Sequence, residues 1–209
     1  AAADHAPRLL KRILALDASH HAAAYTGVAV GGRCVGQVHN DLLPALLECK
    51  LASDREVFES VPADAPGRKV LRITPAMDGT VEARTAALDA ATDALIAAGI
   101  IAKRHGEFFA VSEGWGSDAL ALVDRNAAQV LGTTSVGVHV HCYVPNASPG
   151  GLPLGVWLAK RSASKSYFPS RWDPTAAGGL PAGLSVRENA EKEAAEEAGV
   201  SPEIFRRAV

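Results

Sequence analysis

Apolar and polar residues alternate most regularly between Val136 and Val144. A period of two is typical of a β-strand that buries one face, because successive side chains point to opposite sides. We therefore predict one long strand over residues 136–144, with residues 154–158 as its hairpin partner. The apolar face would carry Val136, Val138, Val140, Cys142 and Val144, and the polar face Gly137, His139, His141 and Tyr143.

Shorter apolar runs predict further strands upstream. Residues 28–30 and 34–38 flank the pair Gly31-Gly32, a pattern typical of a β-hairpin. Residues 53–69 are polar and contain Pro and Gly, which indicates a loop. Three more strands are predicted at residues 70–73, 108–111 and 120–123.

Helical spacing and capping residues predict three helices in the same part of the chain. Residues 7–17 have apolar side chains at amphipathic spacing. Asn40 or Asp41 would cap a helix that runs through Cys49. Thr80 would cap a helix that Gly99 ends and that buries Ala87, Leu88, Ala91, Leu95 and Ile96. The pattern changes at Thr133, so we predict an α+β domain over residues 1–132 and a second domain over residues 133–209.

Residues 178–200 are the strongest candidate for chemistry. Gly178–Ser185 predicts a glycine-rich loop, followed by a helix over residues 186–198. Ser185 and Glu188 have the spacing of a capping box, and Gly199 stands where a helix stop is needed.

Three carboxylates of this helix, Glu193, Glu196 and Glu197, are spaced i, i+3 and i+4 and therefore share one helix face. Like charges held this close repel, and a hard divalent cation such as Mg²⁺ or Mn²⁺ removes that cost. The preceding glycines would let a diphosphate approach the backbone. A run of acidic residues is also typical of an ordinary solvated helix face, and the charges by themselves do not decide between the two.

Composition narrows the class of protein. Nearly half of the 209 residues are apolar, 21% are charged and the net charge is −2. These values are typical of a globular protein and argue against a basic nucleic-acid binder. No apolar run reaches the ~20 residues of a membrane span. The three cysteines are widely spaced and contain no CxxC pair, which favours a reducing intracellular compartment, either cytoplasmic or organellar.

The ordered set around the glutamates resembles the Nudix box, G-x5-E-x7-R-E-U-x-E-E-x-G-U, where U is aliphatic. The residues that match directly are Gly178, Glu193, Glu196, Glu197, Gly199 and Val200. Leu184 stands in place of the first glutamate and Lys192 in place of the arginine. In the family those two residues form a supporting salt bridge, so the loss of both leaves the metal-binding residues in place.

A narrower resemblance covers the chain from about Pro7. Residues 156–162, 167–169 and 177–185 are similar to Nudix proteins related to the Nudix part of fungal thiamine pyrophosphokinase and to plant plastid Nudix hydrolases. Upstream, residues 31–38, 82–85 and 137–139 resemble the N-terminal domain of that subgroup. The resemblance implies an α+β domain followed by an α/β/α Nudix sandwich.

It also implies an enzyme: a hydrolase of diphosphate linkages in small molecules such as oxidised forms of thiamine diphosphate. Mg²⁺ or Mn²⁺ would be held by Gly178, Glu193, Glu196 and Glu197, and the three glutamates would be the catalytic residues. Substrate contacts would come from His139, Lys160, Arg161, Gly178 and Gly179. His139 and His141 could also be half-buried packing residues, and Lys160 and Arg161 ordinary solvated charges.

Residues 133–209 are fewer than a complete Nudix sandwich needs, so we expect the second domain to be C-terminally incomplete. This expectation raises an alternative from another class: a non-catalytic, Nudix-derived structural subunit of a larger assembly, with its open face covered by a partner. Whether the protein forms a homodimer or a larger assembly stays open at this point.

Overall fold

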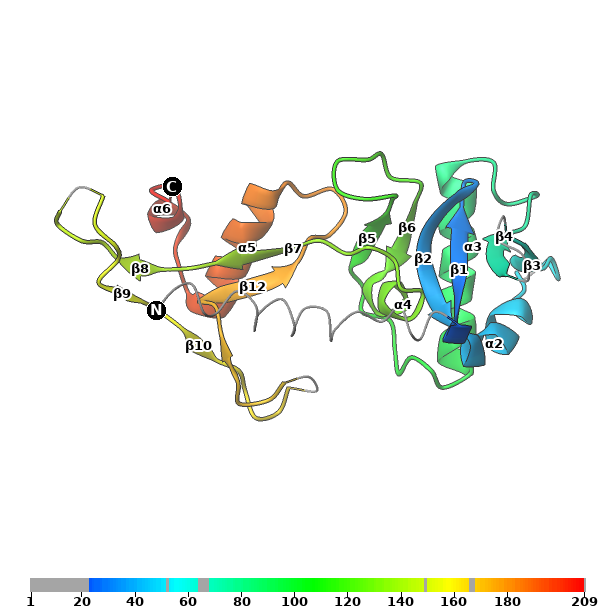
Figure 1. Cartoon of the computed structure of the whole chain (residues 1–209), viewed down its shortest axis with the longest axis horizontal. Helices are drawn as coiled ribbons and strands as arrows, with labels where there is room; N and C mark the ends of the chain where they lie inside the picture. Colours follow the sequence, from blue (N-terminus) through cyan, green and yellow to red (C-terminus); the bar gives the residue numbers. More distant parts are fainter. Residues whose placement is uncertain (1–22, 52, 64–67, 149, 166–167, 209) are drawn as a thin grey trace. The chain divides into compact units, whose positions relative to one another are not determined.

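The computed structural model describes residues 23–51, 53–63, 68–148, 150–165 and 168–208. These residues form two compact units, which divide after Thr134 (Figure 1). The predicted helix at residues 7–17 lies outside the described residues. The first unit contains, in chain order, β1 (Tyr25–Val30), β2 (Arg33–His39), the 3-10 helix η3 (Asn40–Leu42), α2 (Leu43–Leu47), β3 (Phe58–Pro62), β4 (Lys69–Ile73), α3 (Val81–Ala97), β5 (Phe108–Val111), β6 (Ala121–Asp124) and α4 (Arg125–Val130).

Strands β1 and β2 form the predicted hairpin around Gly31-Gly32. Both glycines have a positive φ, of 62° and 72°, which a tight turn between twisted strands requires. The hairpin is one side of a four-stranded sheet with the order β2-β1-β4-β3. Strand β1 pairs parallel with β4, and the other neighbours pair antiparallel.

Strand β3 corrects the predicted loop at residues 53–69. Its sequence, Phe-Glu-Ser-Val-Pro, places Phe58 in the core and leaves much of the rest exposed or half-buried. Such a short, polar strand at the edge of a sheet gives little periodic signal, and its pairing with β4 supplies the stability.

The helix predicted to be capped by Asn40 or Asp41 is shorter and begins differently. His39 is the N-cap of η3, and α2 follows without a side-chain cap, with Pro44 in its first turn. The α-helix ends at Leu47, two residues before Cys49. Proline in the first turn is compatible with helical geometry because the missing N–H would have no partner there.

Helix α3 has the predicted limits and the predicted inward face. The Thr80 hydroxyl accepts a hydrogen bond from the Ala83 amide, and Gly99 has a φ of 72° just after the helix end. The Ile100 amide donates to Leu95 O at 2.9 Å, which closes the last turn. Of the residues predicted to face inward, Ile96 is half-buried and the others are buried.

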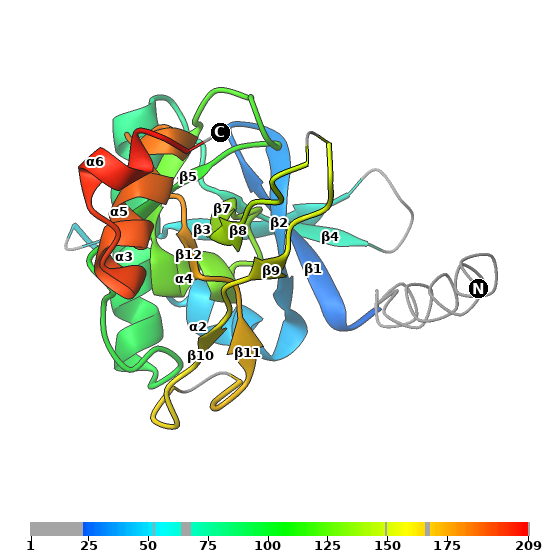
Figure 2. The ribbon, with the colours of Figure 1, turned by 90° about the vertical axis from the view of Figure 1, so that its left-hand side faces the viewer.

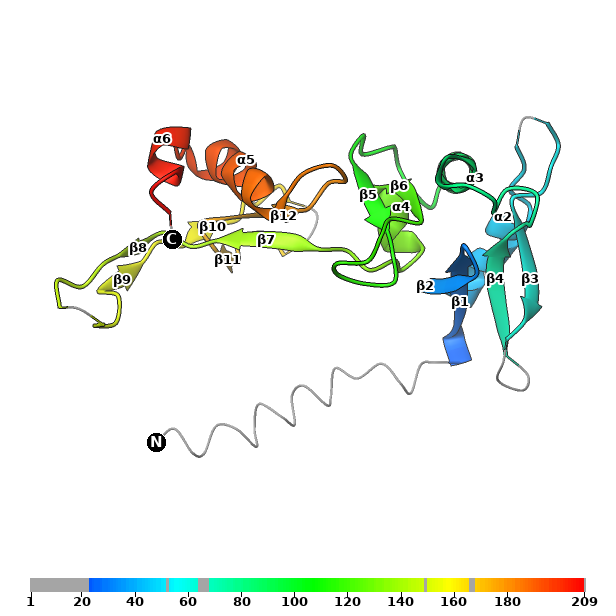
Figure 3. The ribbon, with the colours of Figure 1, turned by 90° about the horizontal axis from the view of Figure 1, so that it is seen from above.

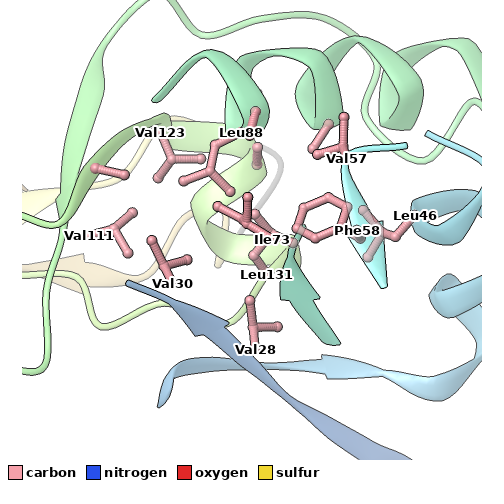
Figure 4. Packing of buried hydrophobic residues seen from close by; sticks show 14 of the residues in the cluster. Val28, Val30, Leu46, Val57, Phe58, Ile73, Leu88, Val111, Val123 and Leu131 are labelled. Atoms are coloured by element: carbon pink, nitrogen blue, oxygen red, sulfur yellow. The ribbon is translucent and has the colours of Figure 1, made fainter. Parts of the chain in front are cut away.

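The core of the first unit lies between the sheet, helix α3 and the β5–β6 pair. Figure 2 shows α3 on one side of strands β1 and β2. Valine, leucine and isoleucine side chains meet there with the ring of Phe58 (Figure 4). The largest fully buried side chains include Val28, Val30, Leu46, Val57, Phe58, Leu71, Ile73, Leu88, Leu95, Val111 and Leu131.

Arg84 ties the β1–β2 turn to the rest of this unit. Its Nε donates to Asp78 O at 3.2 Å and its Nη1 donates to Leu120 O at 2.9 Å. The Asp78 carboxylate in turn accepts a hydrogen bond from the Gly31 amide at 2.7 Å. Gly31 and Arg84 belong to the two upstream segments, residues 31–38 and 82–85, that carry the resemblance. Both contact Asp78, so the two segments meet at this residue.

The second unit contains β7 (Gly137–Val140), β8 (Tyr143–Val144), β9 (Gly155–Val156), β10 (Ala159–Lys160), β11 (Trp172–Asp173), β12 (Ala176–Gly179), α5 (Val186–Ala198) and α6 (Pro202–Phe205). The prediction of one long strand over residues 136–144 was wrong. Strand β7 pairs with β12, whereas β8 pairs with β9, so the chain changes partner at His141-Cys142.

Thr175 explains this change of partner. Its hydroxyl accepts a hydrogen bond from the Cys142 amide at 2.9 Å and donates to Trp157 O at 2.8 Å. The Trp157 amide completes the junction by donating to Cys142 O. A side chain thus satisfies backbone groups where the ladder is interrupted. The hairpin partner predicted at residues 154–158 is confirmed as β9, in a shorter form.

Helix α5 lies along one side of the β7–β12 pair (Figure 3). Helix α6 packs on α5 and buries Phe205, over whose ring the Arg187 guanidinium lies at 5.5 Å. The molecule therefore mixes helices and sheets in both units, and the α/β/α sandwich stays a prediction. In the part of the chain that the structure describes, no helix has the length and apolarity to span a membrane.

Candidate metal site on helix α5

Helix α5 begins and ends at the residues that the sequence predicts. The Ser185 hydroxyl accepts a hydrogen bond from the Glu188 amide, and the Glu188 carboxylate accepts one from the Ser185 amide. Hydrogen bonding of the Glu188 carboxylate to the Ser185 side chain, and to a smaller extent to the Ser185 backbone amide, lowers the pKa of Glu188. Gly199 adopts the left-handed conformation, with φ of 65° and ψ of 21°, at the helix end. The capping box and the glycine stop are confirmed.

The carboxylate of Glu193 lies directly over the Cα of Gly178. A Cβ built on Gly178 would lie within 3.0 Å of Cδ and both carboxylate oxygens of Glu193, a distance that real Cβ atoms essentially never show. Any larger residue here would force the Glu193 carboxylate to shift. Glu193 is correspondingly buried, at 7% exposure, although it is charged.

This arrangement corrects the predicted glycine-rich loop over residues 178–185. Gly178 and Gly179 belong to strand β12, where they pair with Val138 and Gly137 of β7. The loop begins only after them. Glycine is used here for close approach of the carboxylate to a strand rather than for turning the chain, and the two uses look alike in sequence.

The other two glutamates lie on either side of the same helix face. Glu197 Oε2 accepts a hydrogen bond from the Ala177 amide of β12 at 3.0 Å. The Glu196 side chain is 59% exposed and its Oε2 lies 3.8 Å from Lys192 Nζ. The same ammonium group lies 3.4 Å from Glu193 Oε1. Lys192, which replaces the arginine of the box, therefore bridges two of the three carboxylates.

Among the described residues, no three His, Cys, Asp or Glu side chains are gathered closely enough to hold a metal ion. The partners of the three glutamates differ, which explains this: Glu193 turns to Gly178, Glu197 to the Ala177 amide and Glu196 to Lys192. The residues nevertheless suit a hard cation, because all three offer oxygen ligands from one helix face beside the backbone of β12.

His139 lies on the other face of the sheet from Glu193. Ala177 pairs with His139, whereas Gly178, which the Glu193 carboxylate covers, pairs with Val138. Directly opposed residues share a face and successive residues alternate, so His139 points away from α5. Its ring is exposed and makes an edge contact with that of His141 at 6.5 Å. The structure therefore does not bring His139 to the glutamates, and its substrate contact stays a prediction.

Lys160 and Arg161 lie on and beside the β10–β11 hairpin. Arg161 Nη1 donates to Asp173 Oδ2 at 2.6 Å, so this cation is engaged within the hairpin. Lys160 is exposed and pairs in register with Trp172, whose side chain is also exposed. The contact of Lys160 and Arg161 with a diphosphate stays a prediction. The same holds for the substrate contacts of Gly178 and Gly179.

Sequence reasoning overlooked Asn189. It is fully buried on α5, four residues before Glu193, and its Nδ2 donates to Gly179 O at 3.0 Å. The only available signal was its spacing, since i and i+4 share a helix face. Asparagine in a helix otherwise reads as a surface residue, and its burial depends on how α5 packs on β12.

Each of the two units matches a known protein family. Residues 8–135 match the family model described as Domain of unknown function (DUF4743), and residues 137–208 match the NUDIX domain. The chain belongs to the DUF4743 family and carries a Nudix domain. The resemblance drawn from the box and from the upstream motifs is thereby confirmed.

Two Arabidopsis thaliana proteins are similar to the chain over 111 residues. They are Nudix hydrolase 24, chloroplastic, at 38% identity, and Nudix hydrolase 20, chloroplastic, at 39%. Each alignment covers 53% of the chain and 29% of the relative. An uncharacterised protein of Saccharomyces cerevisiae is 33% identical over 84 residues, which are 40% of the chain and 24% of that protein. The matches thus span less than a third of the curated relatives.

Proposed function

We propose that the Nudix domain hydrolyses a diphosphate linkage in a small molecule with the help of Mg²⁺ or Mn²⁺. The observation that carries the proposal is the docking of the acidic face of α5 on β12, with the buried Glu193 carboxylate over Gly178. A solvated surface helix has no reason to bury a carboxylate against a strand, because burial of a charge costs free energy. The names of the Arabidopsis relatives support a hydrolase of this family.

Glu193, Glu196 and Glu197, together with the backbone at Gly178, would hold the cation. A divalent cation bound there would neutralise charge on phosphoryl oxygens and would lower the pKa of a bound water. Lys192 holds Glu193 and Glu196 on the same side of the helix, and the Ala177 amide orients Glu197. A glutamate of this set that is not engaged with the cation would accept the proton from the attacking water.

We propose diphosphates related to thiamine diphosphate, oxidised forms included, as the substrate class. The support is the resemblance of residues 156–162, 167–169 and 177–185 to the Nudix part of fungal thiamine pyrophosphokinase and to plant plastid Nudix hydrolases. Two of the curated relatives carry the word chloroplastic in their names, which favours an organelle over the cytoplasm as the location.

The first test is metal binding by the full chain. A ligand that binds only the folded state stabilises it by about 2.7 kcal/mol at a hundredfold excess over its Kd. Mg²⁺ should therefore raise the melting temperature of the wild type, and Glu193→Gln should remove most of that rise. Glu203→Gln is the matched control, because Glu203 is an exposed glutamate of the same unit that pairs with Arg207.

The second test is turnover. The chain with Mg²⁺ is assayed for phosphate or monophosphate release from thiamine diphosphate, oxidised thiamine diphosphate, nucleotide sugars and NADH. Faster release from the thiamine compounds supports the substrate class, and release only from the others refutes it while leaving a diphosphate hydrolase. No release from any compound, together with no Mg²⁺ effect on melting, refutes the enzyme.

A second candidate function is a non-catalytic subunit of an assembly. The observation in its favour is the exposure of large apolar side chains on and around strands β8–β11, among them Leu152, Leu154, Trp157, Leu158 and Trp172. Large exposed apolar side chains are expected where a partner covers them. This candidate predicts that Glu193→Gln changes neither the metal response nor any activity, whereas the enzyme predicts the loss of both.

A further inference from the structure

Asn189 is the buried polar residue of the second unit that neither the box nor the proposed mechanism uses. It is 0% exposed, and its Nδ2 donates to Gly179 O at 3.0 Å. Its Oδ1 is also buried, and among the described residues no donor reaches it. A buried amide oxygen without a donor is rare in folded proteins, so it needs a specific explanation.

Stability does not explain this residue. The desolvation of an unpaired amide oxygen costs about as much as, or more than, the one hydrogen bond from Nδ2 returns. Asparagine is also a weaker helix former than leucine, which has a comparable volume and no polar atom to satisfy. A leucine at this position would remove the unpaired oxygen but also the donor to Gly179 O, so the two effects on stability should roughly offset each other.

The position of Asn189 supplies the explanation. Helix α5 is attached to β12 at three successive residues: Glu197 binds the Ala177 amide, the Glu193 carboxylate covers Gly178, and Asn189 binds Gly179 O. Two of these three attachments use carboxylates that the proposed function assigns to the cation. A carboxylate that shares its charge with a cation accepts a weaker hydrogen bond from the strand. The neutral amide of Asn189 has no charge to share.

We propose that Asn189 is a positioning residue, the uncharged attachment that keeps α5 in register with β12 when the glutamates bind the cation. The proposal rests on the proposed function, because it assigns Asn189 a role only in the metal-bound state. It acts through Gly179 O and through the placement of Glu193 over Gly178, and it touches neither cation nor substrate.

The experiment compares Asn189→Leu with the wild type in the full chain. In EDTA the urea midpoint of the variant should stay close to that of the wild type, because removal of the unpaired oxygen offsets loss of the donor to Gly179 O. With Mg²⁺, kcat should fall roughly tenfold to a hundredfold, as expected when catalytic groups are misplaced by about 1 Å, while KM changes much less. Ala195→Leu, at an exposed position of the same helix, controls for an added leucine.

The results decide whether Asn189 positions the helix in the metal-bound state or stabilises the fold itself. A lower midpoint in EDTA, or failure of the variant to fold, means that Asn189 stabilises the fold itself and overturns the proposal. Wild-type kcat in Asn189→Leu also overturns it and leaves the enzyme in place. If the wild type itself neither responds to Mg²⁺ nor hydrolyses any diphosphate, the proposed function fails, and the role of Asn189 in the metal-bound state is overturned with it. Asn189→Gln, which keeps an amide, should restore part of the kcat lost in the leucine variant.

Discussion

Gly178→Ala is the sharpest test of how the glutamate helix meets the sheet. The added Cβ would lie within 3.0 Å of the Glu193 carboxylate, whereas ordinary contacts between carbon atoms are about 3.5–4.0 Å. The carboxylate must therefore move by about 1 Å or leave the strand. Pairing of β12 with β7 prevents the backbone of Gly178 from yielding instead.

The cost follows from packing. Insertion of one methyl group into a tightly packed site typically costs about 1–3 kcal/mol. Gly155→Ala is the matched control: Gly155 lies on strand β9 of the same unit, and a Cβ there would have no atom within 4 Å. We expect urea denaturation to show the loss for Gly178→Ala and almost none for Gly155→Ala.

A double-mutant cycle with Glu193→Ala isolates the contact. If the Glu193 carboxylate is what the new Cβ meets, Gly178→Ala should cost little in the Glu193→Ala background. In the wild-type background the displaced carboxylate should also weaken the rise in melting temperature that Mg²⁺ produces. An equal cost of Gly178→Ala in both backgrounds would refute the reasoning, since the strain would then arise elsewhere.

Three further predictions concern single contacts. Ser185→Ala removes the N-cap of α5 and should lower the free energy of unfolding by about 1 kcal/mol in urea denaturation. Arg84→Lys cannot serve both Asp78 O and Leu120 O, so the Gly31 amide should exchange faster with deuterium; unchanged exchange would contradict the junction. Burial by itself would raise the pKa of Asp124. Hydrogen bonds from the backbone amides of Gly106, Asn126 and His105 outweigh this effect, and the pKa lies below its ordinary value. The stabilisation is therefore present above about pH 4 and declines as the pH falls through the folded-state pKa. Asp124→Asn should cost about 1–2 kcal/mol at pH 7 and less below pH 4, and a cost independent of pH would contradict this.

Local signals determined the elements that the sequence predicted well. Helix α5 has its capping box and glycine stop within its own residues, and the β1–β2 hairpin has its Gly-Gly turn. Such features depend on neighbours a few residues away, so they can be read without the fold. The three glutamates on one helix face, and with them the candidate metal site, come from the same local geometry.

Only the tertiary structure decided which strands pair and whether Gly178 lies in a turn or in a strand. The alternation over residues 136–144 predicted one strand, but Thr175, far along the chain, lies where β7 ends and β8 begins with a new partner. Gly178 looked like part of a turn and is instead the strand residue that the Glu193 carboxylate covers. The burial of Asn189 and the face on which His139 lies also depend on contacts between distant segments, which no local pattern records.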